Sequence, residues 1–250
     1  MPPSRDIFLT ILIPAHNEAG NIKPTCQAIL HQFDGEGIDD YEILVVNDGS
    51  TDSTENELLE LTRLSPRIRS VYHPPPNGYG YAVRYGLQFY AGRCVCIVMA
   101  DLSDSPADMI TYYRKLHEGY DCVFGSRFMA RGLVSDYPWL KLIINRVANL
   151  FIRLLFRIKH EDITNAFKAY RREVIDGIQP LLSKHFNLTV EMPLKAVTRG
   201  YSFCRVPISW RNRVQGTSKL KIKEMGSRYL FIVLYVWLEK HLSRGDYLKK

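Results

Sequence analysis

The chain has 250 residues, 46% of them hydrophobic, and a formal net charge of +7. One sizeable core can be built from this length and apolar content, so a second core domain is not required. The positive charge favours anionic partners. Nucleic acid is not expected among them, because the basic residues are scattered and no zinc-finger, homeodomain or RNA-recognition signature is present.

Apolar patterns predict alternating strands and helices through the first half of the chain. The expected strands cover 8–14, 42–47, 68–72, 94–100 and 121–124, and the expected helices cover 20–33, 52–64, 78–91 and 106–118. Several strands are near-continuous apolar runs, which is typical of strands buried on both faces of a parallel sheet. We therefore expect an α/β fold with a largely parallel central sheet flanked by helices.

The second half is predicted to hold a basic helix over 140–158, a region of mixed pattern, a strand near 202–208 and helices at the end. We expect residues 1–220 to form the main domain and 221–250 a C-terminal extension of amphipathic helices. In the basic helix, three arginines, Arg146, Arg153 and Arg157, accompany an apolar stripe. The stripe contains Ile143, Val147, Leu150, Phe151, Leu154 and Ile158.

Two interpretations of this helix stay open. A basic amphipathic helix can lie in a lipid headgroup layer, but it can also face a core and leave its basic side in solvent. The aromatic C-terminal segment is equally consistent with a membrane interface or with a contact to another subunit, either a second copy or a membrane-anchored partner. The apolar stretch 229–238 is shorter than the roughly 20 residues needed to cross a bilayer.

The cysteines and the N-terminal segment favour a particular cellular compartment. The five cysteines are odd in number and contain no Cys-x-x-Cys, which favours a reducing compartment. No convincing secretory signal precedes the first expected strand. We expect a cytoplasmic protein, either free or peripheral on the cytoplasmic face of a membrane.

Three of the expected strands end in polar residues. Pro14-Ala-His-Asn-Glu18 follows the first, Asn47-Asp-Gly49 the second, and Asp101-Leu-Ser-Asp104 the fourth. Ligands of open parallel sheets bind beyond the carboxyl ends of the strands. Oxygen ligands at such an edge suit a hard divalent cation that holds a diphosphate. These residues therefore predict a nucleotide-sugar site.

Four segments resemble the family 2 inverting glycosyltransferases of the GT-A fold, and within them the dolichyl-phosphate mannose synthase branch. They occur in the family's order between about residue 8 and residue 220 and are more specific together than any single motif. The segments are Ile13-Pro-Ala-His-Asn-Glu18; Val45-Val-Asn-Asp-Gly-Ser-Thr-Asp52; Ala100-Asp-Leu-Ser-Asp-Ser-Pro106 with Gly125-Ser-Arg127; and Asp162-Ile-Thr-Asn-Ala-Phe-Lys-Ala-Tyr-Arg171 with Arg213-Val-Gln-Gly-Thr-Ser-Lys-Leu220.

The resemblance implies a set of donor contacts. The nucleobase and ribose would be lined by the first two motifs, and the diphosphate would be clamped by an arginine and a lysine, which are common phosphate partners. An arginine of the third motif would lie near the donor and acceptor phosphates. In this sequence the donor contacts are Pro14, His16, Glu18, Val46, Asp48, Ala100, Asp101, Ser103, Arg213 and Lys219, and the arginine near both phosphates is Arg127.

The resemblance also implies Mg²⁺ or Mn²⁺ as cofactor. Asp101 matches the main metal-binding aspartate, with Ser103 and Asp104 as further ligands. The branch has Asp-Ala-Asp where this chain has Met99-Ala-Asp101, so one carboxylate is missing and a thioether does not replace it for a hard cation. One carboxylate with diphosphate oxygens and water can suffice for Mg²⁺.

The implied reaction moves a hexose, mannose or glucose, from GDP or UDP to a polyprenyl or dolichyl phosphate. An acceptor phosphate is already anionic and needs no strong base, whereas a sugar hydroxyl does. Asp162 and Glu191 are the candidate bases for that second case, and each could instead be a helix cap or the buried partner of a lysine. Asn165-Ala-Phe167 stands where the branch has Ser-Gly-Phe.

Two other functions stay open on sequence grounds. A transferase to a sugar hydroxyl in glycan assembly agrees with the lack of a spanning segment and with Asn165. A nucleotide-sugar-binding protein that has lost catalysis agrees with Met99.

Overall fold

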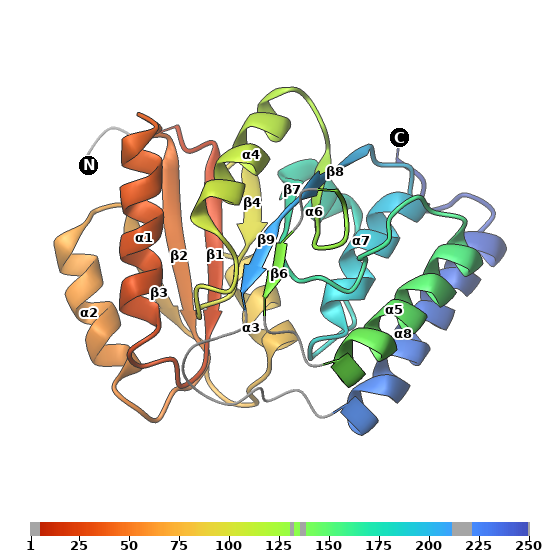
Figure 1. Ribbon diagram of the computed structural model, residues 1–250, viewed down its shortest axis with the longest axis horizontal. Helices are drawn as coiled ribbons and strands as arrows, with labels where there is room; N and C mark the ends of the chain where they lie inside the picture. Colours follow the sequence, from red (N-terminus) through yellow and green to blue (C-terminus); the bar gives the residue numbers. More distant parts are fainter. Residues whose placement is uncertain (1–5, 131–132, 136–138, 212–221, 250) are drawn as a thin grey trace.

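The structure is a computed structural model that describes residues 6–130, 133–135, 139–211 and 222–249. Seven strands form a central sheet in the order β3-β2-β1-β4-β7-β5-β8 (Figure 1). They are β1 (Leu9–Ala15), β2 (Tyr41–Asn47), β3 (Ile68–Tyr72), β4 (Cys94–Ile97), β5 (Cys122–Ser126), β7 (Lys168–Arg171) and β8 (Phe203–Pro207).

The sheet is parallel except at β7. β1 pairs in parallel with β2 and β4, β2 with β3, and β5 with β8. β7 runs antiparallel to both β4 and β5 and joins the two parallel groups. The expected largely parallel α/β fold is confirmed. β7 itself lies in the region to which the sequence assigned no clear pattern.

Helices cover both faces of the sheet. On one face α1 (Ile22–Gly35), α2 (Thr54–Leu64) and α4 (Pro106–His117) contribute to a buried cluster that includes Leu9, Ile11 and Ile13 of β1. On the other face α3 (Tyr79–Gly86), α6 (Arg172–Gly177) and α7 (Leu188–Thr198) pack against Leu12 and its neighbours. A Cβ at Gly86 would lie 2.4 Å from Leu12 Cδ1, so α3 approaches the sheet more closely than any side chain at this position permits.

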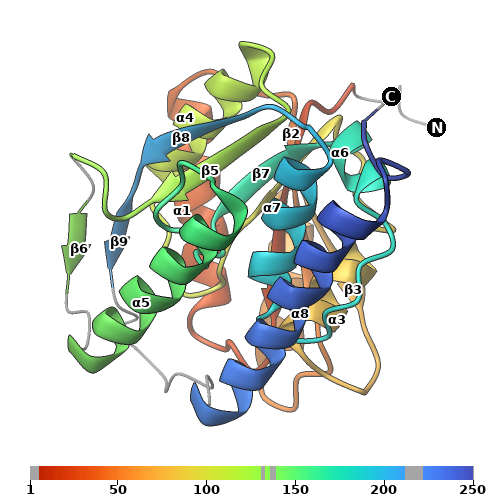
Figure 2. The same cartoon turned by 90° about the vertical axis from the view of Figure 1, so that its right-hand side faces the viewer.

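Two long helices, α5 (Trp139–Phe156) and α8 (Ile222–Leu242), form a further layer beside α7 (Figure 2). Ile152 and Phe156 of α5 pack with Val190 and Leu194 of α7 and with a buried stripe of α8. That stripe comprises Ile232, Val233 and Val236. Within the described part of the chain, no helix combines the length and the apolar character needed to span a bilayer.

A small parallel pair, β6 (Leu133–Ser135) and β9 (Ser209–Arg211), lies outside the main sheet. An isolated antiparallel bridge joins Asp104 to Trp210 of β9. The bridge therefore connects the loop after β4 to β9, the strand that follows β8.

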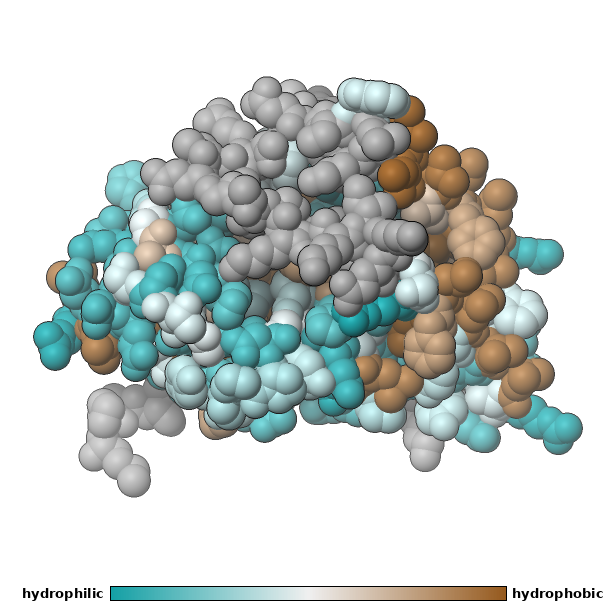
Figure 3. Space-filling view, turned by 90° about the horizontal axis from the view of Figure 1, so that it is seen from below, coloured by the Kyte–Doolittle hydropathy of each residue, from teal (hydrophilic) through white to brown (hydrophobic). Residues whose placement is uncertain are grey.

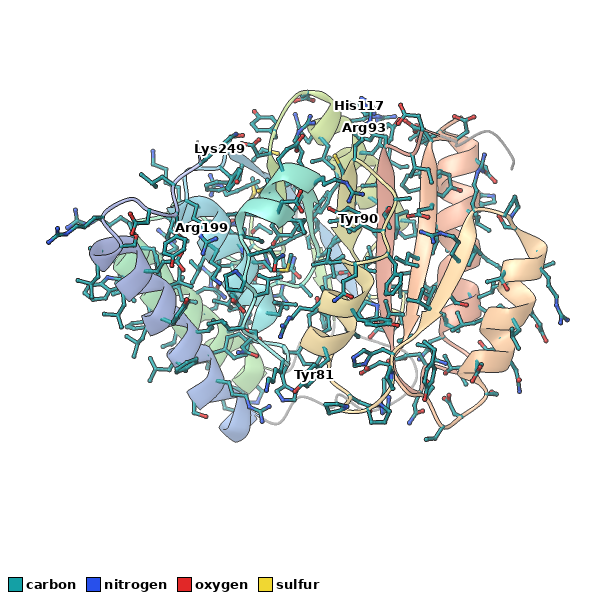
Figure 4. All side chains as sticks on the ribbon, turned by 180° about the vertical axis from the view of Figure 1, so that it is seen from behind. Tyr81, Tyr90, Arg93, His117, Arg199 and Lys249 are labelled. Atoms are coloured by element: carbon teal, nitrogen blue, oxygen red, sulfur yellow. The ribbon has the colours of Figure 1, made fainter. Side chains whose placement is uncertain are left out.

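The carboxyl ends of β1 and β2 point to the lower edge of the molecule in Figure 1. In register, Ala15 at the end of β1 lies beside Asn47 at the end of β2. Seen from behind, Tyr81 marks this same edge, whereas Arg93, His117 and Lys249 lie towards the opposite one (Figure 4). The polar strand endings are therefore gathered at one edge, as their sequence positions predicted.

Candidate active site

The ends of β1 and β2 bring His16 and Asp48 into contact. His16 Nδ1 lies 2.7 Å from the backbone oxygen of Asp48. The amide of Asn77, in the loop before α3, donates to the same oxygen. Gly49 follows in a left-handed conformation with φ of 61°, which turns the chain away from the sheet at little steric cost. Residues from three segments therefore shape this turn.

The Asp48 carboxylate organises the loop between β3 and α3. It is 2% exposed and accepts hydrogen bonds from His73 Nδ1 and from the backbone N–H of Gly78, both at 2.7 Å. Each carboxylate oxygen thus has a partner within the protein. The role implied for Asp48 at the nucleoside stays a prediction, and the structure adds a second role, that of holding this loop against the end of β2.

Sequence reasoning missed His73 and Asn77 as members of this cluster. Both lie in or beside the Pro- and Gly-rich stretch 73–81, which the sequence identified only as a loop. Loops that follow parallel strands carry binding residues, so its position after the third strand was the available signal.

The remaining donor residues of the first two motifs lie around His16. Pro14 pairs in register with Val46, whose side chain is fully buried. The Glu18 carboxylate accepts a hydrogen bond from Asn21 Nδ2 at 2.9 Å, and the Glu18 N–H donates to Thr54 Oγ1 at 2.9 Å. The structure thus brings Pro14, His16 and Glu18 together in one short segment at the edge of the sheet.

The loop between β4 and α4 carries the carboxylates predicted to hold a metal. The Asp101 carboxylate accepts the Ser103 N–H at 3.1 Å. The carbonyl of Ala100 accepts the Thr25 hydroxyl of α1 at 2.8 Å, and Leu102 has a left-handed φ of 55°. These contacts hold the loop in a sharp turn directly after the strand.

Asp104 is the most buried acid of this loop, at 2% exposure. Its carboxylate accepts the backbone N–H of Met99 at 3.0 Å. Burial raises the pKa of Asp104 to about 7, and the nearby charge of Asp101 adds to the rise. Asp104 thus reaches back to the backbone of Met99, the position at which the expected carboxylate is missing.

The donor atoms of this loop suit a hard divalent cation. Among the residues that the structure describes, no three His, Cys, Asp or Glu side chains gather into a metal site. Asp101 and Asp104 nonetheless lie close enough for one charge to affect the other. A cation held by carboxylates, with water and ligand oxygens completing its shell, would offset that repulsion.

Arg127 follows β5 and pairs with Asp162. Arg127 Nε and Nη2 donate to the two Asp162 carboxylate oxygens at 2.8 and 2.7 Å, and the Arg127 backbone N–H donates at 3.0 Å. Asp162 is fully buried and Arg127 is 8% exposed. The rings of Phe128 and Trp210 lie 5.4 and 5.9 Å from the guanidinium carbon. The pair joins β5 to the segment before β7.

Glu191 lies on α7 and is fully buried. Its two carboxylate oxygens accept the backbone N–H groups of Leu182 and Ser183, both at 2.7 Å, and it forms an ion pair with Lys195 at 2.9 Å. Both candidate bases, Asp162 and Glu191, are therefore buried carboxylates paired with a cation of the protein.

Lys168, at the start of β7, is a buried cation that sequence reasoning did not single out. It is 1% exposed, and its ammonium donates to the carbonyls of Ile163, at 3.0 Å, and Asn165. Burial lowers its pKa to about 7. Its place in a short strand beside aromatic and charged residues gave no signal that it is buried.

Arg213 and Lys219, the predicted diphosphate clamp, lie outside the described residues. The segment that carries them follows β9, which begins with Ser209 and bridges to Asp104 through Trp210. The Ser209 N–H also donates to Asp108 of α4 at 2.7 Å.

Sequence comparisons relate this arrangement to known enzymes. Residues 10–178 match the sequence model of Glycosyl transferase family 2. The chain is 30% identical over 216 residues to the polyprenol monophosphomannose synthase of Mycolicibacterium smegmatis, covering 84% of this chain and 80% of that protein. It is 28% identical over 217 residues to the dolichol-phosphate mannosyltransferase of Pyrococcus furiosus, covering 86% of this chain but 60% of that relative's length.

Solved structures give the same fold. The glucosyl-3-phosphoglycerate synthase of Mycobacterium tuberculosis in complex with Mn²⁺, UDP and phosphoglyceric acid superposes with a TM-score of 0.69 at 18% identity, covering 94% of this chain and 78% of that one. Its complex with Mg²⁺ and UDP gives a TM-score of 0.66 at 18% identity, with 94% and 79% covered. These likenesses confirm the expected GT-A architecture.

Proposed function

Because the chain belongs to glycosyl transferase family 2, we propose that it transfers a hexose with inversion from a nucleoside diphosphate sugar to a polyprenyl phosphate. The protein is a glycosyltransferase, as its motifs predicted. The observation that supports this choice of acceptor is the similarity to a polyprenol monophosphomannose synthase over 84% of the chain. The same relative makes mannose the expected sugar.

The state of the two buried acids supports a phosphate acceptor. An acceptor phosphate brings its own negative oxygen, so the protein need not remove a proton. Asp162 is paired with Arg127 and Glu191 with Lys195. The oxygens of both carboxylates already accept hydrogen bonds from groups of the protein, so neither is placed to take a proton from a sugar hydroxyl.

The donor side of the site lies at the ends of β1, β2 and β4. We assign the nucleoside to the segment with Pro14, His16 and Glu18 and to the turn at Asp48, with Val46 and Ala100 contributing backbone. Arg213 and Lys219 are the proposed diphosphate clamp. They follow in sequence the strand β9, whose Trp210 bridges to Asp104.

We assign a divalent cation, Mg²⁺ or Mn²⁺, to Asp101 with Ser103 and Asp104. When bound, such an ion neutralises charge that builds on the departing diphosphate. The protein's own contribution is to hold Asp101 at the end of β4 through the Ser103 N–H. Met99 contributes its backbone N–H to Asp104 rather than a ligand.

The outer face of α5 and α8 supports a lipid acceptor. Contrary to a core-facing role, most of the predicted apolar stripe of α5 points outwards, and α8 adds a second row. Figure 3 shows the resulting apolar patch beside the site edge. The exposed residues are Trp139, Ile143, Ile144, Val147, Leu150, Phe151 and Leu154 of α5 and Leu230, Phe231, Leu234, Leu238 and Leu242 of α8. Exposed apolar patches of this extent mark interaction sites.

We propose that an anionic membrane surface covers this apolar face. Arg153 and Arg157 are exposed at the end of α5, and Lys240 and Arg244 are exposed at the end of α8. The cations match the negative charge of an anionic headgroup layer, and the exposed apolar row matches the acyl chains beneath it. A second copy of this chain would match the apolar row, but its own cations would lie against these cations and repel them.

The activity is tested with GDP-mannose, GDP-glucose and UDP-glucose as donors and a polyprenyl phosphate as acceptor, with Mg²⁺ or Mn²⁺. We expect one donor to yield a lipid-linked sugar of inverted anomeric configuration, identified by nuclear magnetic resonance. Transfer to a free sugar hydroxyl, or binding of donors without any turnover, would overturn the proposal in favour of one of the two other functions.

Membrane binding is tested by flotation with vesicles of phosphatidylcholine and phosphatidylglycerol. We expect the protein to float and a Leu150→Glu/Leu154→Glu variant to stay in solution. Leu64→Glu on α2 is the matched control, because Leu64 is 67% exposed and Leu154 is 70% exposed. A parent protein that does not float but forms a dimer through this face would assign the face to a subunit contact.

A further inference from the structure

One polar contact crosses the otherwise apolar inner side of α5. Asn149 is 2% exposed and lies one turn after Asn145. Asn145 Nδ2 and Asn149 Nδ2 donate to the hydroxyl oxygen of Thr164, at 2.8 and 2.9 Å. The Thr164 N–H donates to Asn149 Oδ1 at 3.2 Å. Thr164 is therefore fixed to α5 through both its side chain and its backbone.

The segment that contains Thr164 is equally fixed to the end of β5 and to Arg127. Asp162, two residues earlier, holds Arg127, and Asn165 Nδ2, one residue later, donates to the carbonyl of Gly125 at 3.2 Å. The Lys168 ammonium donates to the carbonyls of Ile163 and Asn165 on either side of Thr164. A displacement of Thr164 would therefore displace the partners of Arg127.

The two sides of α5 thus have different surroundings. Its outer side carries the exposed apolar row, and its inner side binds the segment that positions Arg127. Burial of an amide is costly unless it is hydrogen bonded, and apolar side chains would fill the same space without that requirement. The amides add what apolar packing lacks, namely a fixed register between α5 and Thr164.

We infer that Thr164 and Asn149 are positioning residues that couple the seating of α5 on a lipid surface to the placement of Arg127, so that lipid binding raises the rate of transfer. The inference rests on the proposed function and adds a regulation to it. Couplings between two sites in proteins change an equilibrium by about 5- to 150-fold, which sets the size of the effect to look for.

The first test compares Thr164→Val with Thr164→Ser. Valine has the shape of threonine without its hydroxyl, whereas serine keeps the hydroxyl. Transfer to a water-soluble short-chain prenyl phosphate is measured with and without phosphatidylcholine and phosphatidylglycerol vesicles. We expect vesicles to raise kcat about fivefold or more for the parent and Thr164→Ser. For Thr164→Val we expect a ratio near one, with flotation and the KM for the nucleotide sugar unchanged.

A Thr164→Val variant that keeps the parent's ratio would overturn the inference. Hydrogen exchange of the parent protein is the second test, and it depends neither on a variant nor on turnover. We expect amides in 160–167 to exchange more slowly when vesicles are added, and unchanged exchange there would also overturn the coupling. If no sugar reaches any prenyl phosphate, the proposed function fails, while the exchange result still decides whether α5 and this segment are coupled.

Discussion

Arg127 and Asp162 form a buried ion pair in which two guanidinium N–H groups meet the two oxygens of one carboxylate at 2.8 and 2.7 Å. A third hydrogen bond comes from the Arg127 backbone. The planar fork of arginine matches a carboxylate in a way that lysine does not. The pair fixes the end of β5 to the segment before β7, and both belong to motifs that the sequence identified separately.

Asp162→Asn should destabilise the fold strongly. The amide has the size of the acid but removes the charge that faces Nε and Nη2 of Arg127, and the loss of one partner of a buried pair costs about 3–5 kcal/mol. Urea denaturation followed by circular dichroism measures the change. Glu60→Gln, which breaks an exposed pair with Lys23, is the matched control and should change little. Equal effects of the two substitutions would contradict the importance of burial.

Much of the fold could be predicted because its determinants are local. β1 and β2 are apolar runs that end in polar motifs, and parallel pairing then places His16 beside Asp48 without further assumptions. The same reasoning placed Asp101 at the shared edge. The contact between Asp48 and His73 could not be predicted, because it depends on the path of a loop 25 residues away in the sequence.

Other features depend on tertiary packing, which the pattern of apolar and polar residues along the sequence does not predict. β7 is four residues long and begins with Lys168, whose burial is possible only because carbonyls of neighbouring segments accept its hydrogen bonds. In α5, helical spacing identified an apolar stripe but not its partner. The stripe faces outwards because Asn149, Ile152 and Phe156 occupy the inner side.

Asp101→Asn should abolish metal-dependent transfer. Stabilisation of transition-state charge by a metal contributes several kcal/mol, which corresponds to a loss of more than about 100-fold in kcat. The rise in thermal midpoint that Mn²⁺ adds to a nucleoside diphosphate should also disappear. Glu55→Gln on the exposed side of α2 should retain both. An Asp101→Asn protein that responds to Mn²⁺ like the parent would move the metal to other residues.

His73→Phe should weaken donor binding more than turnover. The aromatic ring keeps its packing against Tyr85 but loses the hydrogen bond to Asp48, so the loop between β3 and α3 keeps only the Gly78 N–H as its contact with this carboxylate. A hydrogen bond to a charged group contributes about 1.5–3 kcal/mol, so the KM for the nucleotide sugar should rise by about tenfold or more. His31→Phe on the exposed side of α1 serves as the control. A fall in kcat at constant KM would instead place His73 near the reacting atoms.

His160 should make the protein sensitive to acid. Among the described residues neither of its ring nitrogens has a hydrogen-bond partner, and burial, with the nearby charge of Lys168, lowers its pKa to about 4. Between pH 6.5 and 4 the unfolded chain binds a proton at His160 that the folded protein excludes, so the stability contributed by this residue falls as the pH decreases through this window. The full effect of this one group is about 3 kcal/mol. Asp104, whose pKa is raised to about 7, contributes in the opposite direction.

His160→Phe removes the titrating group beside Phe124 and should flatten this pH dependence. Thermal midpoints measured from pH 7.5 to pH 4.5 provide the comparison, because the slope reports the titration even where the larger ring changes the absolute stability. The His31→Phe variant should keep the parent's slope. If His160→Phe loses stability with acid as steeply as the parent, other groups control the response, for example Asp52, Asp121 and Glu161, whose lowered pKa values make the fold less stable in acid.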